Sequence, residues 1–239
     1  MIPWIRAGSP PDSFPDPETA LVDPDGLLAA GGDLGCDRLR EAYRRGIFPW
    51  YSDGQPILWW SPDPRTVFRP GDIHLSRRLA RWLRGHRCEL VIDGDFPGVV
   101  AACAAPRDDD AGTWITDEMG VAYERLFEEG TAHCAEARLG GRTLGGVYGV
   151  AMGRVFFGES MFSAETNGSK VALIGLGRWL ARCGYRLIDA QVASGHLGRL
   201  GAEHWTREKF LDALALWTVE RPEQSLGRAT IQLAELLPD

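Results

Sequence analysis

Long apolar runs and paired cysteines are both missing from this chain of 239 residues. No apolar stretch approaches the roughly 18 residues that a membrane-spanning helix needs. The first residues do not join a charged lead to an apolar core, so we expect no secretory signal. The five cysteines are scattered and no Cys-x-x-Cys pair occurs. That pattern argues against a zinc site or a disulfide framework, and it favours a cytoplasmic protein that holds no metal ion.

Several common catalytic motifs are missing as well. No Gly-x-Ser-x-Gly elbow occurs, and the Gly175-Leu-Gly177 pattern falls inside a predicted helix, so it is not a dinucleotide fingerprint. The segment Asn167-Gly-Ser-Lys170 could hold an anion at a helix N-terminus. It lacks the Arg/Gln-x-x-Gly-x-Gly/Ala loop with which acetyl-CoA-dependent acetyltransferases bind pyrophosphate. The sequence therefore disfavours nucleotide cofactors.

Positive charge is concentrated in one segment of an acidic chain. The whole chain carries a net charge of −7, yet residues 65–87 contain seven arginines and one acid, Asp72. A predicted helix over 73–87 places Arg77, Arg81 and Arg84 on one outer face, with Arg78 beside them. Simple solvation is one interpretation. Arginine in place of lysine, with almost no interleaved acid, also favours binding of phosphate groups.

Aromatic rings and prolines alternate in two neighbouring stretches, Gly46-Ile-Phe-Pro-Trp-Tyr51 and Pro56-Ile-Leu-Trp-Trp-Ser-Pro-Asp-Pro-Arg65. Each proline fixes φ and removes a backbone donor, so this is not the pattern of an ordinary core strand. One interpretation is a satellite hydrophobic cluster under a long loop. The other is a rigid wall for a planar or apolar ligand.

The periodic patterns predict an α+β protein of two domains. Residues 1–25 read as an extended, proline-rich lead-in, and 196–202 as a short turn or helix. Helices are predicted over 37–45, 73–87, 96–105, 116–127, 170–183 and 207–219. Strands are predicted over 89–92, 132–139, 142–152, 154–163 and 186–192. We place a domain boundary near residue 110, which gives domains 1–110 and 111–239.

Carboxylates occur inside two predicted strands. Alternation places Glu159 and Met161 on one face of the first strand, and Asp189 with Gln191 on one face of the second. A strand interior seldom carries a carboxylate unless it is paired or functional. The three polar side chains could brace the sheet, or they could bind and deprotonate an amine. Among the histidines, His133 reads as structural, whereas the role of His196 stays open.

At this point the residues resemble a known family, the leucyl/phenylalanyl-tRNA–protein transferases. The resemblance extends from about Phe14 to Phe210, and the last twenty residues carry none of it. Its motifs, all in family order, are the two Trp/Pro stretches and the segments Gly26-Leu-Leu-Ala-Ala-Gly-Gly-Asp-Leu34, Gly112-Thr-Trp-Ile115, Gly158-Glu-Ser-Met-Phe-Ser163, Ser169-Lys170 and Leu187-Ile-Asp-x-Gln191.

This resemblance implies a small N-terminal α/β domain and a C-terminal acetyltransferase-like (GNAT-like) domain with a mixed, mostly antiparallel sheet. It implies an aminoacyltransferase that moves leucine or phenylalanine, and methionine more weakly, from aminoacyl-tRNA to an N-terminal arginine or lysine of an acceptor protein. That transfer would mark the acceptor for degradation through the N-degron pathway. We expect a monomer that has no membrane partner.

Site residues follow from the resemblance by position. Asp189 and Gln191 are similar to the catalytic pair, and Glu159 would meet the basic end of the acceptor. Further positions carried over are the wall for the 3′ adenosine (Trp50, Trp114, Tyr123) and the aminoacyl pocket (Phe156, Met161, Ile188). With aminoacyl-tRNA as the substrate, the arginine face described above (Arg77, Arg78, Arg81, Arg84) is expected to bind the tRNA. Alternation puts Ile188 opposite Asp189, so its place in the pocket requires a bulge or a different view of that pocket. Trp59 and Trp60 are expected to buttress the domain junction behind Trp50.

The chain departs from the family pattern at two places. Ala137-Arg138 follows Glu136 where a Val-Trp or Thr-Trp pair is expected, and Val147 stands where methionine is common. A smaller side chain at Val147 would widen the apolar pocket and shift the preference among leucine, phenylalanine and methionine.

The expected chemistry needs no cofactor, because an aminoacyl ester is already activated and an α-amine has a pKa of about 7.7–8.0. Positioning and stabilisation of the oxyanion would supply most of the catalysis. Two rival functions are an acyl-CoA-dependent acyltransferase, disfavoured by the missing pyrophosphate loop, and a non-catalytic tRNA or peptide adaptor, disfavoured by carboxylates inside strands.

Overall fold

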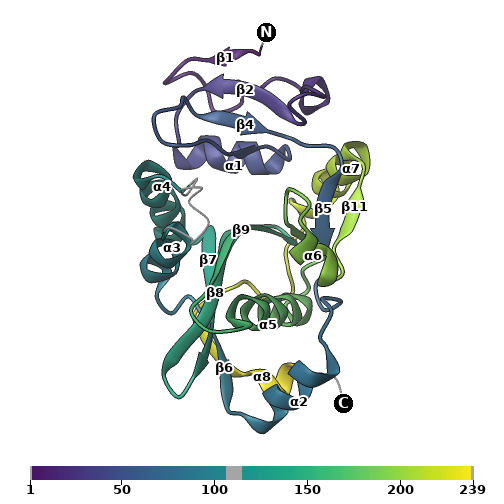
Figure 1. Cartoon of the computed structure of the whole chain (residues 1–239). Helices are drawn as coiled ribbons and strands as arrows, with labels where there is room; N and C mark the ends of the chain where they lie inside the picture. Colours follow the sequence, from purple (N-terminus) through teal and green to yellow (C-terminus); the bar gives the residue numbers. More distant parts are fainter. Residues whose placement is uncertain (1, 106–114, 238–239) are drawn as a thin grey trace.

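The computed structural model describes residues 2–105 and 115–237 of the chain. Within these ranges the strands form two sheets, one of four strands and one of eight. The smaller sheet lies at one end of the molecule, and the larger sheet and its helices make up the remainder (Figure 1). Of the helices in the described ranges, none is both long and apolar enough to cross a membrane.

The smaller sheet is built from the first sixty residues. Its strands, in the spatial order β1-β2-β4-β3, are β1 (Trp4–Ile5), β2 (Leu27–Gly31), β4 (Leu58–Trp60) and β3 (Phe48–Pro49). Trp59 anchors this sheet, because its fully buried indole donates a hydrogen bond to the carbonyl of Gly31 at 2.8 Å. Helix α1 (Cys36–Arg44) packs beneath and buries Leu39 and Tyr43. The Trp/Pro stretches thus contain two short strands, which the prolines had disfavoured in the sequence.

The larger sheet confirms the prediction of an α+β fold with a mixed, mostly antiparallel sheet. Its strands, in spatial order, are β11 (Glu203–Trp205), β5 (Arg65–Phe68), β10 (Leu187–Asp189), β9 (Val155–Ser163), β8 (Arg142–Met152), β7 (Ala132–Leu139), β6 (Cys88–Ile92) and β12 (Ala229–Gln232). Only the β9–β10 pair is parallel among these strands in the described chain.

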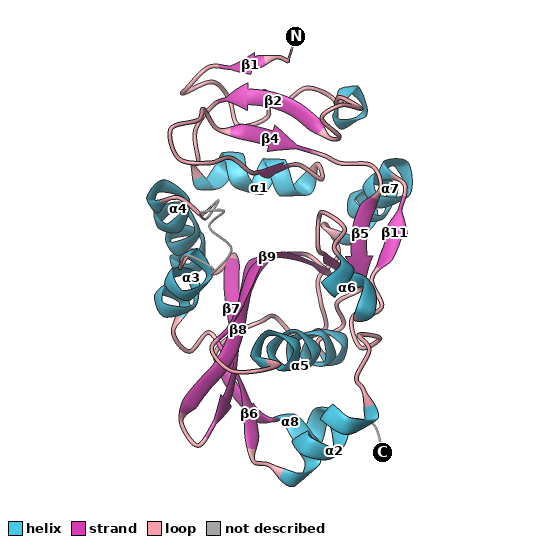
Figure 2. Cartoon of the chain, in the orientation of Figure 1, coloured by secondary structure: helices cyan, strands magenta, loops and turns pink. Residues whose placement is uncertain are grey.

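Helices cover both faces of the larger sheet, which explains why its strands are so apolar (Figure 2). Helices α3 (Phe96–Ala104) and α4 (Asp117–Glu128) lie against one face and α5 (Gly168–Arg182) against the other. The remaining helical segments are η1 (Pro17–Thr19), α2 (Arg77–Gly85), α6 (Gly195–Arg199), α7 (Arg207–Trp217) and α8 (Leu233–Leu236). The two faces accordingly belong to separate buried clusters.

The change of sheet does not coincide with the domain boundary that was predicted near residue 110. Strand β5 follows the smaller sheet in sequence, yet it pairs with β10 and β11 of the larger one. Strand β6 also precedes residue 110 and pairs with β7. The sheets therefore change between Trp60 and Arg65, whereas residue 110 itself lies outside the described residues.

Three predicted element limits are wrong for local reasons. Helix α2 begins at Arg77 rather than Ile73, because the hydroxyl of Ser76 accepts the backbone N–H of Leu79 and caps the helix there. Helix α5 begins at Gly168 rather than Lys170, because Asn167 adopts the left-handed region and ends the preceding loop there. Strand β10 ends at Asp189, three residues earlier than expected.

The last twenty residues, which carry no family motif, complete the larger sheet. Strand β12 pairs antiparallel with β6 at the outer edge of this sheet. Helix α8 then packs against α5 and β6, and it buries Leu233 and Leu236. Without this segment the backbone of β6 would present an unpaired strand edge.

Candidate active site

A small cavity opens where strands β9 and β10 part. The two strands pair over only three residues, Leu187–Asp189 with Val155–Phe157. Gln191 then adopts φ 55°, in the left-handed region that ends a strand, and the chain leaves the sheet. The resulting cavity of about 150 Å³ is lined by Phe48, Pro49, Trp50, Glu159, Ala190, Gln191 and Val192.

Asp189 lies behind this cavity in a buried ion pair. Nε and Nη2 of Arg65 donate to the two carboxylate oxygens of Asp189 at 2.8 and 2.7 Å. The two side chains are 0 and 1% exposed. Arg65 also donates from Nη1 to the carbonyl of Gly46 at 3.0 Å and lies over the ring of Phe48. The carboxylate is therefore desolvated and held in one orientation.

Gln191 connects Asp189 to Glu159. Its backbone N–H donates to Oδ1 of Asp189 at 3.0 Å, and its side-chain Nε2 donates to Oε1 of Glu159 at 3.3 Å. The structure thus brings together the three polar residues that the sequence placed around one pocket. Gln191 and Glu159 line the cavity, whereas Asp189 contacts it only through Gln191.

Two tyrosines support Glu159 from the side of α1 and α4. The hydroxyl of Tyr123 donates to Oε2 of Glu159 at 2.6 Å, and the hydroxyl of Tyr43 lies 2.6 Å from that of Tyr123. Burial raises the pKa of Glu159 to about 7, although the two tyrosine hydrogen bonds act in the opposite direction. Glu159 is therefore a carboxyl that changes its charge near neutral pH.

The expectation that Glu159 and Met161 share a face is wrong because β9 contains a bulge. The register with β8 shifts between Tyr148 and Gly149, which pair with Ser160 and Gly158 and leave Glu159 without a partner in that strand. Glu159 accordingly bonds to Tyr123 on one side of the sheet, whereas Met161 packs into the cluster beneath α5. A bulge reverses the alternation of every later residue in a strand.

The four residues predicted for the aminoacyl pocket lie together on the face beneath α5. Val147 is opposite Met161 across β8 and β9, and Phe156 is opposite Ile188 across β9 and β10. Val147, Phe156 and Ile188 are buried, and Met161 packs against the same cluster. Ile188 does point away from Asp189, as alternation requires. The predicted aminoacyl pocket and Asp189 therefore lie on opposite faces of the sheet, beside the place where β9 and β10 part.

The three aromatic residues predicted for the ligand wall have different surroundings. Trp50 is 41% exposed and lines the cavity, and its carbonyl accepts the indole N–H of Trp60 at 2.7 Å. Trp60 thus contacts Trp50, whereas Trp59 is buried within the smaller sheet, and the role of both as a buttress of the domain junction stays a prediction. Tyr123 is buried and hydrogen-bonded to Glu159. Trp114 lies outside the described residues.

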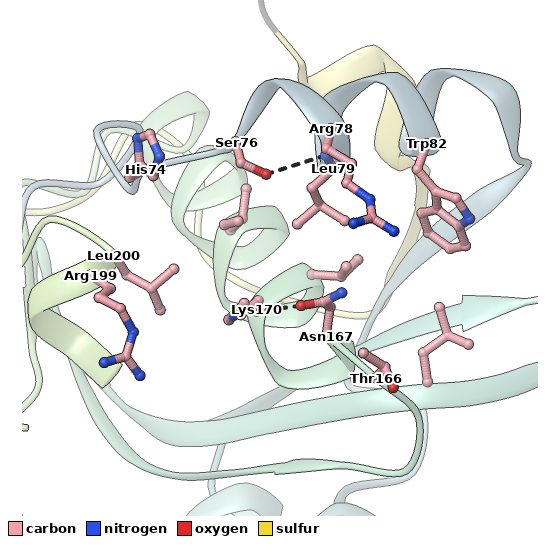
Figure 3. A pocket seen from close by; sticks show the side chains of 13 residues that line it. His74, Ser76, Arg78, Leu79, Trp82, Thr166, Asn167, Lys170, Arg199 and Leu200 are labelled. Carbon is pink, nitrogen blue, oxygen red and sulfur yellow. Dashed lines mark hydrogen bonds between the residues drawn. The ribbon is translucent and has the colours of Figure 1, made fainter. Parts of the chain in front are cut away.

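The four predicted arginines are all exposed, but they border two different hollows. Arg77, Arg81 and Arg84 line a hollow of about 460 Å³ together with Arg178 of α5. Arg78 instead lines a cavity of about 580 Å³ between α2 and the start of α5 (Figure 3). The helix therefore presents its arginines to two neighbouring sites.

Of the two histidines considered in the sequence, only His133 lies where a structural role requires it. Nδ1 of His133 lies 2.8 Å from Oδ2 of Asp93 in a buried pair, so the structural interpretation of His133 is confirmed. His196 lies in α6, and burial, followed by the charges of Lys170 and Arg199, lowers its pKa. Within the described chain its buried Nε2 has no hydrogen-bond partner.

Sequence reasoning gave no role to two residues of the site, Arg65 and Tyr43. Arg65 stands inside one of the family motifs, directly after a Pro-Asp-Pro segment, but its partner is distant in sequence. Tyr43 lies in the first predicted helix, and its side chain is fully buried. A buried hydroxyl at such a position requires a partner, and that requirement was the available signal.

Comparison with known proteins defines the class of protein to which the chain belongs. The family model for the leucyl/phenylalanyl-tRNA protein transferases matches residues 67–215, and the model for the N-terminal domain of the same family matches residues 32–63. A relative from Pseudomonas putida named leucyl/phenylalanyl-tRNA–protein transferase is 55% identical over 215 residues, which cover 90% of this chain and 94% of the relative. The chain belongs to the leucyl/phenylalanyl-tRNA–protein transferase family.

Solved structures are similar at a much lower level. The L-PGS structure from Bacillus licheniformis has a TM-score of 0.41 and 11% identity, covering 72% of this chain and 57% of the other. A GCN5-related N-acetyltransferase from Kribbella flavida has a TM-score of 0.33 and 12% identity, covering 70 and 60%. At these TM-scores the two structures add nothing to the description of the fold, which the strand pairing given above defines.

Proposed function

We propose that the chain transfers leucine or phenylalanine, and methionine more weakly, from aminoacyl-tRNA to the N-terminal arginine or lysine of acceptor proteins. Acceptors marked in this way would enter the N-degron route of degradation. The observation that carries the proposal is the contact of Gln191 with Glu159 in a cavity beside Trp50, with Asp189 fixed behind them. Family membership supports the choice of substrates.

In this mechanism the acceptor's α-amine attacks the ester carbonyl. A C–N bond forms and the C–O bond to the ribose breaks. The proton that the attacking amine loses passes to water or a neighbouring phosphate, which in turn supplies the proton with which the ribose hydroxyl leaves. The side-chain carbonyl of Gln191 holds the attacking amine, because its Nε2 is already engaged with Glu159. Such a group works mainly by positioning, and an activated ester needs neither a metal ion nor a nucleotide cofactor.

Asp189 acts through Gln191 in this proposal. Both of its oxygens accept hydrogen bonds from Arg65, and Oδ1 also accepts the backbone N–H of Gln191. This arrangement supports an indirect action of Asp189 on the amine, through Gln191, over direct contact between the carboxylate and the amine. Asp189 fixes the left-handed backbone of Gln191 and thereby the direction of its amide.

The basic end of the acceptor would pair with Glu159. A carboxyl whose pKa is about 7 is partly ionised at neutral pH, and a cation brought beside it would favour the ionised form. The aminoacyl side chain would pass through the gap between β9 and β10 to Val147 and Met161. Trp50, together with Trp114, would stack on the 3′ adenosine.

The remaining parts of the proposal concern tRNA and the place of the reaction. Arg77, Arg81 and Arg84 would bind phosphates of the tRNA, since they surround one hollow with Arg178. The protein would act as a monomer in the cytoplasm. All five cysteines are free thiols, which agrees with a reducing compartment.

One assay tests the proposal against its rivals. The full chain is incubated with radiolabelled leucyl-tRNA and with peptides that begin with Arg, Lys or Ala. We expect label on the Arg and Lys peptides alone, and its loss in Gln191→Asn, which keeps the left-handed backbone but shortens the amide. Label retained only as a protein complex would support the adaptor, and reaction only with acyl-CoA would support the small-molecule acyltransferase.

A further inference from the structure

The cavity that Arg78 lines between α2, α5 and α6 lies away from the candidate active site and takes no part in the proposed function. Its volume of about 580 Å³ is in the range of ligand sites, and it separates α2 from the N-terminal turn of α5 and from α6. Arg78, Lys170 and Arg199 each come from a different one of these helices and reach the cavity (Figure 3). Of the described residues that line it, none is acidic.

The three cations lack compensating charge. Among the ion pairs of the described residues, none involves Arg78, Lys170 or Arg199. Lys170 contacts the side-chain oxygen of Asn167 at 3.3 Å, a neutral partner. The charges of Lys170 and Arg199 also contribute to the lowered pKa of the nearby His196. Three cations that face one cavity without an acid create a positive potential there, which attracts anions.

The rest of the lining limits what kind of anion fits. Leu79, Leu144 and Ile174 supply apolar surface, and the indole of Trp82 stands at the end of the cavity opposite Arg199 (Figure 3). The indole stacks on His86 at 4.4 Å with an interplanar angle of 22°, which fixes its orientation. An aromatic wall beside cations is the arrangement that binds a stacked base and its phosphate.

We propose that this cavity binds a nucleoside phosphate, with the phosphate between Arg78 and Lys170 and the base against Trp82. The geometry supports this assignment because the guanidinium of Arg78 extends toward Asn167 and Lys170, and Trp82 lies beside it (Figure 3). The nucleotide comes either from the single-stranded 3′ end of the tRNA or from the free pool. The first source rests on the proposed function, since it extends tRNA contact beyond the arginines of the neighbouring hollow.

The test measures binding of radiolabelled CMP and AMP to the full chain by equilibrium dialysis, with cytidine and inorganic phosphate for comparison. We expect both monophosphates to bind in the millimolar range or more tightly, and more tightly than cytidine. The double variant Arg78→Gln/Lys170→Gln should raise the Kd about tenfold for each cation removed. Arg221→Gln, an exposed arginine that lines neither hollow, is the matched control and should leave the Kd unchanged.

Two results would overturn the proposal. One is the absence of monophosphate binding to the wild type at millimolar concentration. The other is equal binding to the wild type and to the double variant, with Lys170→Gln alone serving if the double variant does not fold. Trp82→Leu adds a separate readout, because it should weaken CMP while leaving inorganic phosphate unaffected.

Competition with tRNA distinguishes the two sources. If CMP displaces deacylated tRNA and the double variant weakens both ligands, the cavity takes a nucleotide of the tRNA. If the variant loses CMP but keeps its tRNA affinity, the ligand is a free nucleotide. Transfer from leucyl-tRNA is measured separately. Transfer without monophosphate binding would refute only the cavity assignment, and monophosphate binding without transfer would refute only the proposed function.

Discussion

Arg65 and Asp189, which are 124 positions apart in the sequence, form a two-point ion pair with N···O distances of 2.8 and 2.7 Å. The pair lies directly behind the candidate active site and is almost completely buried. A buried charge left without its partner is strongly unfavourable, whereas removing both partners together costs much less. The stability of the site therefore depends on both residues at once.

We predict that Asp189→Asn and Arg65→Met each lower the free energy of unfolding by about 3–5 kcal/mol, measured by urea denaturation. The double variant Arg65→Met/Asp189→Leu should be less destabilised than the sum of the single changes. Asp189→Asn should also cut transfer strongly while the folded fraction still binds aminoacyl-tRNA. Single variants with wild-type stability, or normal transfer by Asp189→Asn, would contradict this account.

Glu159 should make the stability of the protein depend on pH. Its folded-state pKa of about 7 lies above the ordinary value of 4.5, so the folded state binds a proton more tightly than the unfolded chain. The stabilisation that Glu159 gives to the folded state by binding this proton is complete below pH 4.5, and it is lost as the pH rises through about 7. Relative to Glu159→Gln, the wild type should lose up to about 3 kcal/mol across this window. Parallel stability curves for the two proteins would rule out the raised pKa.

Tyr123 and Tyr148 offer a matched pair of variants. Tyr123 donates to Glu159, whereas the buried hydroxyl of Tyr148 has no hydrogen-bond partner within the described residues, and their rings meet edge to face at 5.4 Å. Tyr123→Phe should raise the pKa of Glu159 further and move the acidic limb of the transfer rate to higher pH. Tyr148→Phe should leave the rate profile and the stability nearly unchanged. The reverse result would mean that Tyr123 only fills space.

Much of the larger sheet could be predicted because its signals are local. The strands from Ala132 to Ser163 alternate with glycine turns, and helix α4 begins at the Thr116 cap that its sequence indicates. The family motifs likewise pointed to Glu159, Asp189 and Gln191, which the structure brings into contact around one cavity. Each of these features depends on a short stretch of sequence, so it can be predicted without knowing which distant residues that stretch will contact.

The parts that could not be predicted depend on distant partners. Nothing near Arg65 shows that it pairs with Asp189, or that β5 enters a sheet made mostly of later strands. The bulge at Glu159 has no turn residue to mark it beyond Gly158, so period-two reasoning placed Met161 on the wrong face. The short strands of the smaller sheet were hidden by prolines that lie at strand ends, where no ladder hydrogen bond is lost.

Val147 is expected to influence the choice of amino acid. It lies opposite Met161 on the face beneath α5, and it is smaller than the methionine expected there from the family resemblance. Val147→Met should narrow the space and disfavour phenylalanine relative to leucine by about tenfold. The measurement is the ratio of kcat/KM for leucyl- and phenylalanyl-tRNA. An unchanged ratio, in a variant with normal stability, would place the aminoacyl side chain elsewhere.

The arginines that face Arg178 should control how salt affects tRNA binding. Arg77→Gln/Arg81→Gln should weaken binding and reduce the slope of log K against log salt by roughly one unit for each phosphate that is no longer neutralised. Filter binding at several salt concentrations measures this slope, with Arg221→Gln as the control. If the slope is unaffected, the arginines of this hollow are merely solvated.

Strand β5 has a consequence for how this family can vary. It carries Arg65 from the end of the smaller sheet to a place between β10 and β11, where the guanidinium contacts Gly46 and lies over the rings of Phe48 and Phe210. The two halves of the chain are therefore not interchangeable modules. A chimera that joins the first sixty residues of one relative to the remainder of another should work only when the donated Gly46 carbonyl and Phe48 ring fit the recipient's arginine.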